Sequence, residues 1–123
     1  MICDNITAAA GRLRFAGRDA GELARQYGTP LYLMDERRLR QNCRVYRESM
    51  SAHFSRAMPL YASKALSCRR VYEIVAEEGL GADVVSAGEI AIAKSAGFPM
   101  EKVFFHGSAK TDDEIAYAMD CGV

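Results

Sequence analysis

The chain has 123 residues, half of them hydrophobic, and its 16 basic and 16 acidic residues give a formal net charge of zero. This length supports one modest hydrophobic core, and the balanced charge argues against nucleic acid or an anionic membrane surface as a partner. No apolar run approaches the roughly 20 residues that a membrane span needs, and the first residues lack the pattern of a signal peptide, so the sequence predicts a cytoplasmic protein.

The first 29 residues are predicted to form a lead-in to the main domain. Residues 13–16 are compatible with a strand, and residues 20–27 are compatible with a short helix. Gly28 stands where a glycine commonly ends a helix.

From residue 30 onward, predicted strands and helices alternate. Residues 30–34 are predicted as a short strand, and Asp35 follows as the N-cap of a helix. This helix carries apolar residues at steps of three and four, which is the spacing of one buried face. These residues are Leu39, Cys43, Tyr46 and Met50.

Three further strands are predicted, over residues 58–63, 82–86 and 102–106. Their ends lie about 20 residues apart, which suits β-α-β units with a parallel sheet and right-handed crossovers.

The helices between these strands have recognisable ends. One is predicted over residues 67–78 and ends at Gly79. Two more begin at residues with the spacing of a capping box, in which a Ser or Thr and the Glu three positions later bond each other's backbone. These pairs are Ser86 with Glu89 and Thr111 with Glu114. The last helix should place Ile115, Ala118 and Met119 on one face.

Repeated β-α units build either an open doubly wound sheet or a closed (β/α)₈ barrel. An open sheet that binds a nucleotide should carry Gly-x-Gly-x-x-Gly or Gly-x-x-x-x-Gly-Lys-Ser/Thr after a strand, and the sequence has neither. A whole barrel needs about 250 residues, so this chain supplies about three of eight units. We predict an α/β fold, a partial (β/α)₈ TIM barrel, with residues 1–29 as lead-in and residues 30–123 as the N-terminal units.

The four cysteines, Cys3, Cys43, Cys68 and Cys121, are widely spaced and form no Cys-x-x-Cys pair. In a cytoplasmic protein this pattern is typical of free thiols. With only two histidines in the chain, the sequence gives little support for a metal site.

Lys64 is the strongest single candidate for chemistry. Side chains alternate along a strand, so residues 58, 60, 62 and 64 are expected on one face, which would be apolar apart from the lysine. An apolar setting favours the neutral, nucleophilic amine that Schiff-base chemistry requires. Taken alone, a lysine at a strand end more commonly points into solvent.

Four segments in order resemble the fold-type III pyridoxal-phosphate decarboxylases, and the first of them resembles the opening of diaminopimelate decarboxylases closely. The segments are Tyr27-Gly-Thr-Pro-Leu-Tyr32, Tyr61-Ala-Ser-Lys-Ala65, Gly81-Ala-Asp-Val-Val-Ser-Ala-Gly-Glu89 and Phe105-His-Gly-Ser-Ala-Lys-Thr111. One departure is Ser108, where the family usually has Asn. The resemblance implies a barrel of the alanine racemase-like type.

The resemblance also implies roles for individual residues. Lys64 would hold pyridoxal 5'-phosphate covalently, and Asp83 would lie close to it as a cofactor-binding acid that holds or protonates the released amine. His106 would either line the cofactor site or serve as a structural histidine. Ser86 would either only cap its helix or also contact the cofactor, and Lys110 would be either a surface charge or a site residue.

The implied activity is the decarboxylation of meso-diaminopimelate to L-lysine, in a longer homodimeric protein whose remaining parts complete the site. The isolated chain is therefore expected to be inactive and prone to associate through its exposed sheet edges. Alternatives are an ornithine, arginine or carboxynorspermidine decarboxylase, a non-catalytic truncated homologue, or an unrelated complete α/β domain.

Overall fold

The computed structural model describes residues 4–123. The free thiol expected at Cys3 lies outside these residues. The chain forms two compact units, one ending at Arg38 and the other running from Leu39 to Val123. The boundary that the sequence suggested at residue 29 stays a prediction about the division of the longer protein.

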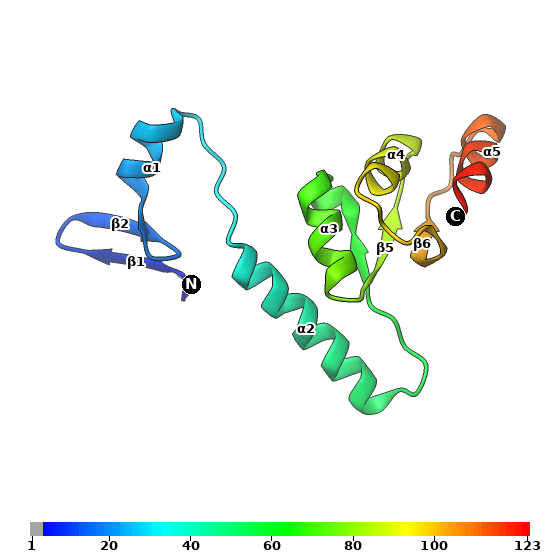
Figure 1. Cartoon of the computed structure of the whole chain (residues 1–123), viewed down its shortest axis with the longest axis horizontal. Coiled ribbons are helices and arrows are strands. Elements are labelled where there is room, and N and C mark those ends of the chain that lie inside the picture. Colours follow the sequence, from blue (N-terminus) through cyan, green and yellow to red (C-terminus); the bar gives the residue numbers. More distant parts are fainter. Residues whose placement is uncertain (1–3) are drawn as a thin grey trace. The chain divides into compact units, whose positions relative to one another are not determined.

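The first unit is a three-stranded antiparallel sheet followed by a helix (Figure 1). Its elements are β1 (Ile6–Ala9), β2 (Arg12–Phe15), β3 (Arg18–Asp19) and α1 (Ala20–Tyr27). The helix predicted at 20–27 is confirmed, and the strand compatible with residues 13–16 is present one residue earlier, as β2. Strands β1 and β3 were not predicted, because their side chains are largely exposed and show no alternation of apolar and polar residues.

Residues 30–34 do not form the predicted strand. They have no pairing partner among the residues that the structure describes, and the Tyr32 side chain is 99% exposed. Apolar and β-prone residues favour an extended chain, but a strand also needs a neighbour with which to hydrogen-bond. The helix that follows does begin as predicted, because Asp35 Oδ1 accepts a hydrogen bond from the Arg38 amide at 3.2 Å.

The second unit is built on a parallel sheet with the strand order β4-β5-β6. The strands are β4 (Leu60–Ala62), β5 (Gly81–Val84) and β6 (Val103–Phe105). The helices are α2 (Glu36–His53), which starts in the first unit, α3 (Arg69–Glu77), α4 (Ala87–Ser95) and α5 (Asp112–Cys121). Two short 3₁₀ turns are η1 (Ser63–Ala65) and η2 (Met100–Lys102). The predicted alternation of strands and helices is confirmed, with strands shorter than expected.

The two faces of this sheet differ. Directly paired residues of parallel strands point to the same side, so Tyr61, Ala82 and Val103 share one face. That face carries the hydrophobic core against the helices (Figure 1). The buried residues of this core are Cys43, Val71, Tyr72, Val75, Leu80, Ala82, Val84, Ile90, Ala93, Phe98, Val103, Ala118 and Cys121. The opposite face, with Ala62 and Asp83, is the one that a closed barrel turns inward.

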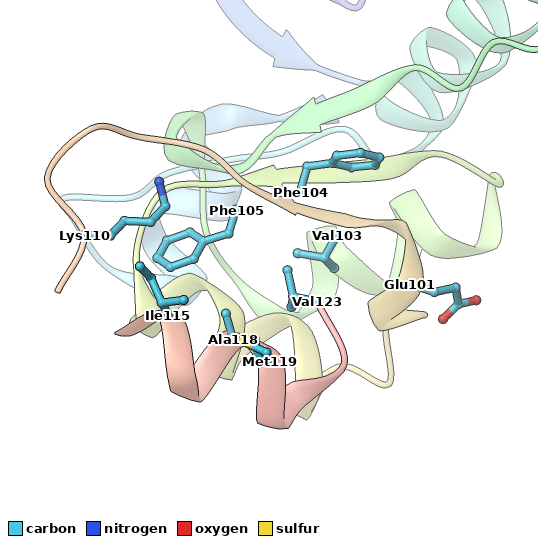
Figure 2. A pocket seen from close by; sticks show the side chains of 9 residues that line it. All are labelled: Glu101, Val103, Phe104, Phe105, Lys110, Ile115, Ala118, Met119 and Val123. Atoms are coloured by element: carbon cyan, nitrogen blue, oxygen red, sulfur yellow. The ribbon is translucent and has the colours of Figure 1, made fainter. Parts of the chain in front are cut away.

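An apolar groove lies between β6 and α5 (Figure 2). Val103 and Phe105 point toward the helix, and Phe104 points to the other side of the strand. Ala118 is buried, but Ile115 and Met119 from the predicted apolar face of α5 are 43% and 70% exposed. Because β6 has no second neighbour among the described residues, the sheet is open at this edge, as expected of barrel units without the next strand.

Gly81 is required by the close packing of the three strands, which gives a testable prediction. A Cβ atom at this position would lie 2.5 Å from Leu60 Cδ2 and 2.7 Å from the Lys102 carbonyl oxygen, and that backbone atom cannot move aside easily. We expect Gly81→Ala to lower the free energy of unfolding by about 1–3 kcal/mol, measured by urea denaturation. Gly88→Ala is the control, since its Cβ would meet only Ser86 Oγ at 3.8 Å. Equal stabilities of the two variants would contradict the prediction.

Candidate active site

Three side chains singled out from the sequence lie at or just beyond the carboxyl-terminal parts of the three parallel strands. Lys64 lies in η1 directly after β4, Asp83 lies on β5 opposite Ala62, and His106 follows β6. The His106 amide donates a hydrogen bond to the Val84 carbonyl at 2.8 Å, which continues the β5–β6 alignment past the last paired residues. In β/α barrels this end of the strands carries the reacting groups.

The predicted placement of Lys64 on a strand face is wrong. Strand β4 ends at Ala62, and the chain then turns into the 3₁₀ helix Ser63–Ala65, so the alternation of side chains does not extend to the lysine. The lysine is exposed, and the apolar surroundings expected for its amine are not formed by residues 4–123.

The backbone around Lys64, in contrast, is held on both sides. Ser63 is fully buried, with its Oγ 2.9 Å from the Asp83 carbonyl oxygen and 2.5 Å from Glu89 Oε2. After the lysine, the Tyr61 hydroxyl donates to the Leu66 carbonyl at 2.9 Å. The turn therefore presents an exposed side chain on a backbone that is held by hydrogen bonds on both sides. Sequence analysis missed these anchors, although a serine beside a candidate catalytic lysine was a possible signal.

Asp83 and His106 are neighbours in space. Asp83 Oδ1 and His106 Nδ1 are 3.8 Å apart, which is longer than a hydrogen bond but close enough for attraction when the imidazole is protonated. The Asp83 side chain is 27% exposed and that of His106 is 78% exposed. Both side chains lie on the face of the sheet that carries Ala62 and Asp83, and the roles assigned to them stay predictions.

Two of the residues whose roles were left open, Ser86 and Lys110, have local partners in the structure. Ser86 caps α4, because its Oγ accepts a hydrogen bond from the Glu89 amide at 3.2 Å. Lys110 is not a free surface charge, since its Nζ donates to the Gly107 carbonyl at 2.5 Å and lies 4.6 Å from the centre of the Phe105 ring. It lines the groove beside α5 (Figure 2), on the face of the sheet opposite Asp83.

An amine, a carboxylate and an imidazole at one sheet edge suit a carbonyl compound that a lysine can bind covalently. Within residues 4–123, no group of three or more His, Cys, Asp or Glu side chains is arranged to hold a metal ion. Cys43, Cys68 and Cys121 are free thiols. In the same described part of the chain, no helix has both the length and the apolar character needed to cross a bilayer.

Comparison with known proteins gives a consistent assignment. Residues 36–123 match the family model described as pyridoxal-dependent decarboxylase, pyridoxal binding domain. The chain is 46% identical over 113 residues to a diaminopimelate decarboxylase of Actinosynnema pretiosum, covering 92% of this chain and 25% of that protein. It is 45% identical, over 92% of its length and 26% of the relative, to a diaminopimelate decarboxylase of Methanothermobacter thermautotrophicus.

Solved structures show the same relationship. Diaminopimelate decarboxylase from M. jannaschii in complex with L-lysine matches with a TM-score of 0.85 and 34% identity, covering 98% of this chain and 29% of that one. The lysine/ornithine decarboxylase of Vibrio vulnificus complexed with putrescine matches with a TM-score of 0.72 and 28% identity, covering 83% of this chain and 27% of that one. The chain thus spans about a quarter of the length of the curated relatives it matches.

Proposed function

Because this chain belongs to the pyridoxal-dependent decarboxylases, we propose that it forms the first units of the cofactor-binding barrel of a longer, cytoplasmic, homodimeric carboxy-lyase. Its reaction is the decarboxylation of meso-diaminopimelate to L-lysine. The observation that carries the proposal is the placement of three residues at the same end of neighbouring parallel strands: Asp83 within β5, Lys64 after β4 and His106 after β6. The similarity to diaminopimelate decarboxylases supports the choice of substrate.

The residues present fit pyridoxal 5'-phosphate, because its aldehyde needs a lysine amine on a fixed backbone. When bound, this cofactor would accept the electron pair that remains on the substrate when carbon dioxide leaves. Lys64 would hold it covalently through its amine and would be released when the substrate amine takes its place. Asp83 would take up or return the proton on the Lys64 Nζ atom during this exchange. His106, with its Nδ1 atom 3.8 Å from Asp83 Oδ1, would line the same side.

The substrate assignment is tested by measuring carbon dioxide release by the full-length protein from meso-diaminopimelate, ornithine, arginine and carboxynorspermidine. We expect meso-diaminopimelate to be used with the highest kcat/KM and L-lysine to accumulate as product. A higher kcat/KM for any of the other three would contradict the assignment. The isolated 123-residue chain is expected to release no carbon dioxide from any of them, because the remaining barrel units and the partner subunit complete the site.

The role of Asp83 gives a second test. Asp83→Asn keeps the shape of the side chain but removes its charge and its ability to accept a proton, so we expect kcat to fall by about 10²-fold. Asp120→Asn, an exposed residue of α5, is the matched control and should keep the parent rate. If Asp83→Asn retained the parent kcat across the pH range, the carboxylate would have no part in proton transfer.

A further inference from the structure

The first turn of α4 is bonded to the turn that carries Lys64. Glu89, in this first turn, has its Oε2 atom 2.5 Å from the Ser63 hydroxyl oxygen. The same oxygen accepts a hydrogen bond from the Val85 amide at 2.7 Å. One carboxylate oxygen therefore joins the end of β5, the start of α4 and the residue immediately before the lysine.

Helix capping does not account for this arrangement, as a comparison with α5 shows. In α5, Glu114 Oε2 accepts from the Thr111 amide at 3.0 Å, which completes the reciprocal capping box. The same spacing in α4 gives only half a box, because Ser86 accepts from the Glu89 amide but lacks the reciprocal bond. The Glu89 carboxylate is directed to Val85 and Ser63 instead.

Ser63 is completely buried, and the shorter of its two hydroxyl contacts is the one to Glu89. A buried hydroxyl is costly unless it is hydrogen-bonded, and a charged acceptor gives a stronger bond than a carbonyl. Its single proton is donated to either Glu89 Oε2 or the Asp83 carbonyl, which both lie within reach. The backbone is thus fixed before Lys64, and the Tyr61 bond to Leu66 fixes it again after the lysine.

We propose that Ser63 and Glu89 are a positioning pair that sets where the Lys64 amine meets the cofactor aldehyde. This inference rests on the proposed function, in which Lys64 must form and break a covalent bond in every turnover. Neither residue has to touch the cofactor. Their effect passes through the backbone of the turn, since a displacement of about 1 Å at a reacting group lowers rates by up to roughly 100-fold.

The test uses the full-length protein, stripped of cofactor and then mixed with pyridoxal phosphate. Two quantities are measured: the rate of covalent attachment, from the visible absorbance of the lysine-bound cofactor, and amide hydrogen exchange in residues 63–66. We expect Ser63→Ala and Glu89→Ala to slow attachment roughly 10- to 100-fold and to speed exchange in the turn. Glu89→Gln should keep most of the parent rate, because its amide oxygen still accepts. Glu114→Ala, at the same helix position in α5, should not change attachment.

The double variant Ser63→Ala/Glu89→Ala should be no slower than the slower single variant, because both changes break one connection. The positioning pair would be overturned if the double variant slowed attachment by the product of the two single-variant factors. It would also be overturned if both single variants attached the cofactor at the parent rate. Equal decreases in the attachment rate for Glu89→Gln and Glu89→Ala would also overturn it, since the carboxylate charge would then act on the reaction itself. If the unsubstituted protein did not attach the cofactor at Lys64, that result would contradict the proposed function itself.

Discussion

Replacing Lys64 by alanine is expected to lower the decarboxylation rate of the full-length protein by about 10⁴-fold, the largest effect of any single substitution in this chain. The alanine variant has no amine to hold the cofactor or to exchange with the substrate. Because the Lys64 side chain is exposed at the end of β4, the change should leave the fold intact. Initial rates of carbon dioxide release, with circular dichroism as a check on folding, measure the effect.

Lys64→Arg separates covalent chemistry from positive charge. The guanidinium group stays protonated and cannot act as the nucleophile, so this variant should be as inactive as Lys64→Ala. Lys94→Ala, at an exposed position in α4, should keep the parent rate. Activity in Lys64→Arg close to that of the parent would mean that the lysine contributes only its charge.

The second large effect concerns stability and involves Glu78, a buried acid at the end of α3. Its side chain is 7% exposed and bonds two arginines of α2, with Arg44 Nε at 2.7 Å and Arg40 Nη1 at 3.0 Å. Arg47 Nη1 also donates to the Glu78 carbonyl oxygen at 2.7 Å. We expect Glu78→Ala to lower the free energy of unfolding by about 3 kcal/mol, because it leaves these guanidinium groups without their shared partner.

The adjacent Glu77 provides the matched control for this prediction. Its side chain is 51% exposed and pairs with Arg40 in solvent. Exposed ion pairs contribute at most about 1 kcal/mol, so Glu77→Ala should have a small effect in the same urea titration. Equal decreases in the free energy of unfolding for the two variants would show that the burial of Glu78 does not contribute to stability.

The same ion-pair cluster predicts a dependence of stability on pH. The hydrogen bond from Arg44, together with that from Arg40 and the charges of both, outweighs burial and lowers the pKa of Glu78 from 4.5 to about 2. A lowered pKa stabilises the folded state fully above the unfolded value, and this contribution is lost as the pH falls from 4.5 toward 2. The stability difference between the parent and Glu78→Ala should therefore be constant near pH 7 and shrink below pH 4.5. A difference that persisted undiminished at pH 3 would contradict the assignment.

Much of the fold was predictable because its signals are local. Gly28 ends α1 and Gly79 follows α3, both with positive φ, and the Thr111–Glu114 capping box starts α5 as the spacing indicated. Such signals act within a few residues of the chain, so periodicity and capping locate helices well. The lengths of the strands, and the absence of the strand predicted at 30–34, depend instead on which neighbouring strands are available for pairing. The local sequence does not carry that information.

The site was predictable in part. Motif resemblance singled out Lys64 and Asp83, and the position at a strand end singled out His106. The structure brings Asp83 and His106 within 3.8 Å of each other, and the roles of all three stay predictions. The 3₁₀ turn of Lys64 was missed because strand alternation was extended beyond the last paired residue. The contact between Ser63 and Glu89 joins residues 26 positions apart, and its geometry follows only from the folded sheet.

The central claim is that the Lys64 amine forms the covalent bond to the cofactor, and one measurement tests it most directly. The full-length protein is incubated with pyridoxal phosphate, reduced with borohydride and digested, and the modified peptide is identified by mass spectrometry. We expect stable labelling of Lys64, with no comparable labelling of Lys94, Lys102 or Lys110. Labelling of another lysine, or no labelling at all, would contradict the account.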